Sequence, residues 1–130
     1  MASAEEHLQL ARQAKNNYLA VSTSDYGNVP GMIEHASLTI EHLLKAMLAT
    51  EKPDGVNTHR GHNLGALLQA TTHDTSPFQN FVYDIDGLYT AARYDSGFST
   101  SLMKEPEKTA KQLNDFINYT AKIVSQNRNR

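Results

Sequence analysis

The chain has no cysteine and no tryptophan among its 130 residues. The lack of cysteine excludes disulfides, thiolate zinc sites, iron–sulfur clusters and cysteine nucleophiles, and it agrees with a reducing compartment. No window approaches the roughly 20 consecutive apolar residues that span a bilayer. The first residues, Met-Ala-Ser-Ala-Glu-Glu, have neither the basic region nor the apolar run of a signal peptide. We therefore expect a cytoplasmic protein.

The chain also has no excess of basic residues. The chain carries 12 Lys and Arg against 14 Asp and Glu, which gives a formal net charge of −2. Proteins that hold duplex DNA or long RNA by charge usually have a basic excess, so extensive nucleic-acid wrapping is disfavoured and a local cationic pocket is favoured. The length fits a single domain, 1–130, that can bury a core without disulfides or metal ions.

Apolar residues recur at helical spacing along most of the chain, and no segment keeps the alternation of a strand. Residues 3–23 begin with Ser3 and Glu6 at the spacing of a capping box, in which each side chain binds the other residue's backbone N–H. Residues 32–50 carry the strongest apolar stripe, and its breadth is typical of a central helix. These patterns predict an all-α protein.

Three further helices are expected after the central one. Residues 62–72 predict a short helix. The next helix opens at Ser76, which would be its cap, with Pro77 at the first helical position, and Pro106 opens the last helix. Residues 126–130 are expected to be a frayed tail. The predicted architecture is an up-and-down four-helix bundle with an additional short helix.

Two adjacent Glu-His pairs, Glu34-His35 and Glu41-His42, lie seven residues apart on the second predicted helix. Helical bundles that hold iron or manganese use Glu-x-x-His, because that spacing directs both side chains at one ion. Neighbouring residues on a helix point about 100° apart, so one ion is poorly placed to take both. A polar helix edge is therefore favoured over a metal site, and we expect no metal and no cofactor.

A second histidine group lies between the second and third predicted helices. His59 and His62 are spaced by three, so they could share a metal ion in a loop, but they have no acidic or thiolate partner nearby. A structural role for His62 is favoured. Asn63 or Thr58 could equally cap the helix that follows.

Arg93 and Tyr94 stand at the end of the fourth predicted helix. A cation at this position is favoured by the helix macrodipole, which is a purely structural reason for it. A planar guanidinium also suits recognition of a phosphate or carboxylate, and both interpretations stay open. The sequence contains no glycine-rich phosphate loop and no Gly-x-Ser-x-Gly motif.

Taken in order, these motifs resemble the HEPN domain, a small helical domain associated with nucleotide and RNA biology. Glu-x-x-x-Lys-Ala-x-Leu lies on the second predicted helix, His-Asn-Leu opens the next, and Arg-Tyr precedes the closing helix. The matching positions are Glu41, Lys45, Ala46, Leu48, His62, Leu64, Arg93 and Tyr94. The resemblance spans about residues 4–125 and implies a bundle that dimerises through its faces.

Many HEPN proteins are ribonucleases of toxin–antitoxin and antiviral systems, and their mark is an Arg followed, after four to six residues, by a His. Arg12, Arg60 and Arg93 are not followed by a His at this spacing. The positions after them hold Asn17, Tyr18, Leu19, Gly65, Ala66, Leu67, Phe98, Ser99 and Thr100. Because the motif is missing, the resemblance implies no catalytic residues, and the chain is expected not to be an enzyme.

The resemblance then implies a non-catalytic homodimer that binds a nucleotide or RNA, or pairs with a small nucleotidyltransferase, in a toxin–antitoxin or defence-type system. The expected nucleotide or phosphate contacts are Lys45, His62, Arg93 and Tyr94, supported by Glu41 and Asn63. Lysine and arginine would meet phosphates and the tyrosine would stack on a base.

Three alternatives remain at the level of sequence. The first is an internal polar network, in which Glu41 and Lys45 form an ordinary i, i+4 helix pair. The second is a metal-independent HEPN ribonuclease with a displaced base such as His59, His62 or His73. The third is a metal-binding helical bundle that uses the Glu-His pairs.

Overall fold

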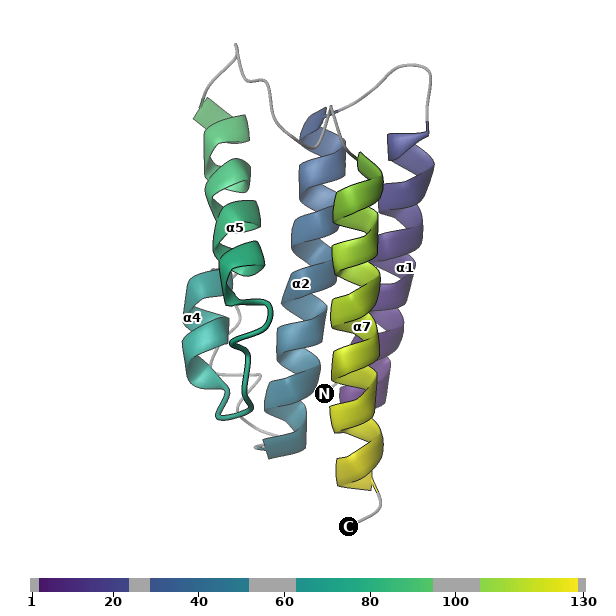
Figure 1. Ribbon diagram of the computed structural model, residues 1–130, viewed down its shortest axis with the longest axis vertical. Helices are drawn as coiled ribbons and strands as arrows, with labels where there is room; N and C mark the ends of the chain where they lie inside the picture. The colour runs from purple at the N-terminus through teal and green to yellow at the C-terminus, as the bar shows by residue number, and fades with distance from the viewer. Residues whose placement is uncertain (1–2, 24–28, 52–62, 95–105, 129–130) are drawn as a thin grey trace.

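The computed structural model describes residues 3–23, 29–51, 63–94 and 106–128, and it describes the backbone alone at 29–30, 89–94 and 128. Every regular element in these ranges is a helix. The helices are α1 (Ala4–Ser22), α2 (Val29–Glu51), α4 (Leu64–Ala70), α5 (Gln79–Tyr94) and α7 (Pro106–Arg128). They pack together as a bundle, which confirms the all-α prediction (Figure 1).

The four long helices alternate in direction along the chain, and the short α4 lies beside the start of α5 (Figure 1). Helix α2 packs against α1, α4, α5 and α7. Its broad apolar stripe is the reason, because a helix that is apolar over most of its circumference must be covered on several sides. The prediction of a central second helix is therefore confirmed. No helix in the described ranges is long and apolar enough to cross a membrane.

The capping box predicted for the first helix is present. The Glu6 backbone N–H donates to the Ser3 hydroxyl at 3.1 Å, and the Ser3 backbone N–H donates to the Glu6 carboxylate at 3.3 Å. At the other end of the chain, α7 continues to Arg128, so helix covers the first part of the segment 126–130 that was expected to fray.

Helix α5 begins at Gln79, later than predicted. Ser76 donates its backbone N–H and its hydroxyl to Asp74 Oδ1, at 3.0 and 2.7 Å, and the Phe78 N–H donates to the Thr75 carbonyl at 2.9 Å. Asp74 thus holds Ser76 in a turn, and the Ser76 hydroxyl bonds to Asp74 instead of to the start of the helix. The prediction that Ser76 caps this helix, with a proline at its first position, is wrong.

The core is a continuous set of apolar side chains contributed by all of the described helices. Its largest fully buried members are Tyr18, Phe116, Ile33, Ile40, Leu43, Leu44, Met47, Leu64, Leu67, Ile85 and Leu113. Phe78 stacks on Phe116 with ring centroids 4.5 Å apart and meets Tyr119 edge-on. These aromatic contacts anchor the segment before α5 to α7.

Candidate functional site

Lys45 and Glu41 form a nearly buried ion pair on α2. Lys45 Nζ lies 3.2 Å from Glu41 Oε2, and the two side chains are only 12% and 5% exposed. The spacing of four residues brings both side chains to one helix face, as the sequence predicted. The charge of Lys45 is therefore offset within the protein, and little of its side chain is accessible to a ligand in a single chain.

Next to this pair, two histidines join α1 to α2. His7 Nδ1 lies 3.2 Å from His42 Nδ1, and the ring planes are inclined by 27°. Such a contact requires one ring to donate an N–H to the lone pair of the other, so at least one imidazole is neutral. Burial lowers the pKa of His7, and the neighbouring His42 and Lys45 lower it further, while Glu6 and Glu41 act in the opposite direction.

We call His7, Glu41, His42 and Lys45 the histidine–lysine cluster. The sequence predicted the ion pair but not the histidine contact. A signal was present, because His7 occupies an apolar-stripe position that repeats with Ala11, Ala14 and Tyr18 along the first helix. That position faces α2, so a polar side chain there needs a partner on α2.

The part of the chain that the structure describes contains no group of three or more His, Asp or Glu side chains that could hold a metal ion. The Glu34 side chain points to solvent, while Glu41 pairs with Lys45. The second pair therefore does not form the polar helix edge expected for it, because Glu41 is buried and His42 contacts His7 on α1.

The other residues predicted to contact a nucleotide or phosphate lie at the end of the bundle away from Lys45 or outside the described residues. Helix α5 ends at Tyr94 beside the beginning of α2 (Figure 1), so Arg93 belongs to that end. Lys45 follows the α2 start by 16 residues (45 − 29), which is about 24 Å of helix. One phosphate group in a single chain therefore does not reach both. His62 lies outside the described residues.

Asn63 caps the short helix α4. Its side-chain oxygen accepts the Ala66 N–H at 3.0 Å, and the Asn63 backbone is extended, as it is at a helix cap. This resolves the choice between two candidate caps in favour of Asn63. The other candidate, Thr58, lies outside the described residues.

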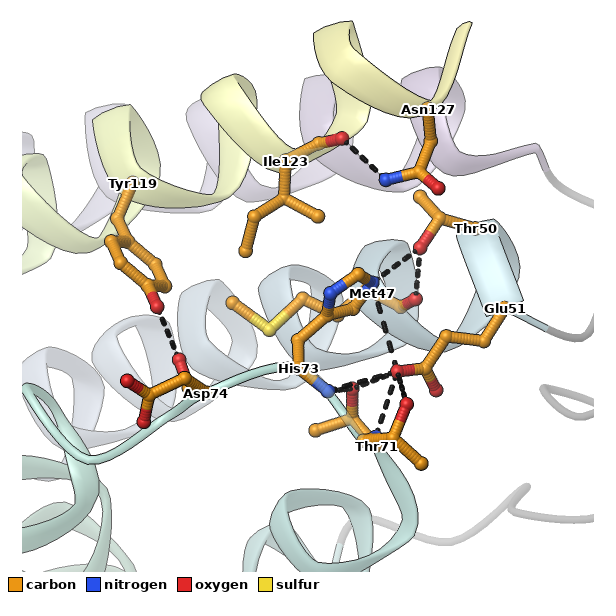
Figure 2. A network of polar contacts seen from close by, with 10 residues as sticks. Met47, Thr50, Glu51, Thr71, His73, Asp74, Tyr119, Ile123 and Asn127 are labelled. Carbon is orange, nitrogen blue, oxygen red and sulfur yellow. Dashed lines mark hydrogen bonds and ion pairs between the residues drawn. The ribbon is translucent and has the colours of Figure 1, made fainter. Parts of the chain in front are cut away.

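A second polar network closes the far end of α2, and Figure 2 shows it. Glu51 Oε1 accepts the hydroxyls of Thr71 and Thr72, at 3.0 and 2.7 Å, and the backbone N–H groups of Thr72 and His73, at 2.7 and 2.9 Å. Burial alone would raise the pKa of Glu51, but the hydrogen bonds from Thr72 and Thr71 and the nearby His73 outweigh it, so the pKa is lowered. We call Glu51, Thr71, Thr72 and His73 the Glu51 network.

His73 is held firmly in this network, which bears on its candidacy as a displaced base. Its Nε2 lies 2.7 Å from the Thr50 hydroxyl oxygen and 3.6 Å from Glu51 Oε1. Thr50 already donates its only hydroxyl hydrogen to the Met47 carbonyl at 2.6 Å. Nε2 of His73 must therefore carry the hydrogen in this contact, so this nitrogen acts as a donor and not as a base.

Residues 3–128 match the family model described as the HEPN domain. No curated protein and no solved structure matches the chain. The matched range includes all of the described helices, the histidine–lysine cluster and the Glu51 network.

Proposed function

Because the chain belongs to the HEPN domain family, we propose that it is a module that binds the phosphates of a nucleotide or RNA without cleaving RNA. One observation carries the proposal: the family match covers residues 3–128, while no Arg in the chain is followed by a His at the spacing of the family's ribonuclease motif. RNA cleavage needs a base near the 2′-hydroxyl and a cation at the phosphate. Arg93 supplies a cation, and nothing at the motif spacing supplies the base.

The proposed contacts fall into two sets at opposite ends of the bundle. Arg93 and Tyr94 form one set, for phosphate contact and base stacking. Lys45 belongs to the other set, and its pairing with Glu41 makes it the weaker ligand contact in a single chain. His62 is kept in the proposed site on the strength of the family motif alone.

A homodimer is part of this proposal, because it unites the two sets. In an antiparallel pair of chains with two-fold symmetry, the end that carries Lys45 in one chain lies next to the end that carries Arg93 in the other. An extended RNA strand would bridge the same two ends along one chain. Because Lys45 lies about 24 Å along α2 from the end near Arg93, one phosphate group is not expected to contact both sets in a monomer.

The family resemblance also supports a protein partner, a small nucleotidyltransferase of a toxin–antitoxin or defence-type system. A transferase encoded next to this chain is the candidate to co-express. Co-purification of the two proteins in a fixed ratio is the expected result. A transferase that never co-purifies from a soluble, folded mixture contradicts this part of the proposal.

Thermal unfolding against a panel of nucleotides and short RNAs tests ligand binding. A ligand at 100 times its Kd stabilises the fold by about 2.7 kcal/mol. We expect Arg93→Ala to abolish that stabilisation and Tyr94→Leu to reduce it, while Lys122→Ala, at an exposed position of α7, leaves it intact. The absence of stabilisation by any nucleotide or RNA in the wild-type protein contradicts the proposal.

A further inference from the structure

His7 is a buried histidine that the proposed function does not use. Its residue is 6% exposed, and its Nδ1 meets His42 Nδ1 at 3.2 Å. Its other ring nitrogen, Nε2, is buried and has no hydrogen-bond partner among the described residues. One ring nitrogen of His7 therefore has a hydrogen-bond partner on α2, and the other is buried without one.

This difference between the two ring nitrogens of His7 indicates which of them carries the hydrogen. A hydrogen on His7 Nε2 would be a buried donor without an acceptor, which is unfavourable. The arrangement without a buried, unpaired N–H places the hydrogen on His7 Nδ1, which donates to His42 Nδ1, and leaves Nε2 with an unpaired lone pair. The assignment follows from the hydrogen-bond arrangement.

An additional proton has no good place in this contact. On His7 it must go to Nε2, where the new N–H meets no acceptor. On His42 Nδ1 it would face the hydrogen of His7 and break the bond. The titratable groups that act on His7 are His42 and Lys45, which oppose a further positive charge, and Glu6 and Glu41, which favour it.

We propose that the contact between His7 and His42 is an acid-sensitive switch. At physiological pH the two rings are neutral, and their contact holds the N-terminal half of α1 on α2. Protonation of the contact releases that half of α1. The switch lies beside the ion pair of Lys45 and Glu41, so its opening also exposes this pair to solvent. The inference is independent of any nucleotide, RNA or transferase.

The direction of the pH dependence follows from proton linkage. Burial, His42 and Lys45 lower the pKa of His7 below the 6.5 of an ordinary histidine, so the unfolded chain binds the proton more tightly. The contribution to stability is fully present above pH 6.5 and is lost as the pH falls below it, towards the folded-state pKa. Each pKa unit between the two states raises the unfolding constant tenfold.

The test compares the wild-type protein with two variants, each of which replaces one imidazole of the pair by an amide that hydrogen-bonds but does not take up a proton. In His7→Asn an amide N–H replaces the donor to His42, and in His42→Asn an amide oxygen replaces the acceptor from His7. Chemical unfolding is measured at pH 7.5 and 5.5. We expect the unfolding constant of the wild-type protein to rise at least severalfold more between these pH values than that of His7→Asn, while His42→Asn, in which His7 is still buried, keeps part of the dependence. Equal pH dependence in the wild-type protein and His7→Asn overturns the switch.

An NMR titration of the imidazole nitrogens of the wild-type protein keeps the proposal testable should a variant fail to fold. We expect His7 to carry its hydrogen on Nδ1 at pH 7.5 and to take up a second proton with a midpoint below 6.5. The amides of the first half of α1 should shift with the same midpoint, while those of α7 beyond its contacts with α1 stay fixed. A His7 midpoint at or above 6.5, or unmoved α1 amides, contradicts the proposal.

Discussion

Glu51 and Thr72 are joined by two hydrogen bonds of 2.7 Å, because one carboxylate oxygen of Glu51 accepts both the backbone N–H and the hydroxyl of Thr72. Glu51 is the last residue of α2, and Thr72 lies between α4 and α5. The bonds therefore fasten the α4–α5 connection to the end of the central helix. Hydrogen bonds to a charged acceptor are stronger than neutral ones, which makes this contact a testable support of the fold.

The substitution Glu51→Gln tests this fastening. It removes the charge while keeping nearly the same shape, so the donors that converge on Oε1 meet a neutral amide oxygen, which is a weaker acceptor than a carboxylate. We expect the free energy of unfolding to fall by about 1.5–3 kcal/mol, measured by chemical denaturation at pH 7. Glu34→Gln, at an exposed position of the same helix, is the control and should change stability by less than about 0.5 kcal/mol. Equal effects of the two substitutions contradict the role of Glu51.

Acid should weaken the same contact. The pKa of Glu51 is lowered from its ordinary value of 4.5, so the contribution of the carboxylate is present above pH 4.5 and is lost as the pH falls through the folded-state pKa. The stability difference between the wild-type protein and Glu51→Gln should therefore shrink between pH 6 and pH 3. A difference that stays constant over this range contradicts the lowered pKa.

The cap of α4 gives a third prediction. Asn63→Ala leaves the Ala66 N–H without its acceptor, and we expect a loss of about 1 kcal/mol in the free energy of unfolding. Asn118→Ala, at an exposed position inside α7, is the matched control and should cause no loss. Equal stability of the two variants shows that the cap does not contribute.

The ion pair of the histidine–lysine cluster gives a fourth prediction. Lys45→Met leaves the Glu41 carboxylate buried without its cation, and we expect a loss of about 3–5 kcal/mol. The double variant Glu41→Gln/Lys45→Met removes both charges and should recover most of that loss. Additive effects of the two substitutions contradict a coupled pair.

Local contacts were predictable from the sequence because they connect residues within one helical turn. The capping box of Ser3 and Glu6 and the pair of Glu41 and Lys45 follow from spacings of three and four residues. Where two local contacts competed, the prediction failed: the hydroxyl of Ser76 bonds to Asp74 instead of capping α5. Both possibilities are short-range, and only the observed turn distinguishes them.

Contacts between distant segments were not predictable. His7 and His42 are 35 residues apart, and Glu51 and Thr72 are 21 apart, so each contact depends on how the helices pack and not on a local pattern. The order of motifs along the sequence also does not show which residues lie close together in the fold. It indicated the family, but it did not reveal that Lys45 and the end of α5 lie at opposite ends of the bundle.

The central claim is that the protein binds RNA or nucleotide phosphates and leaves RNA intact. The most direct measurement incubates the purified protein with a short RNA labelled at both ends and follows binding and strand integrity in the same sample. We expect the RNA to be bound and to remain full length, and Arg93→Ala to lose the binding while Lys122→Ala keeps it. Cleavage by the wild-type protein that disappears in Arg93→Ala, or no binding at all, would contradict the claim.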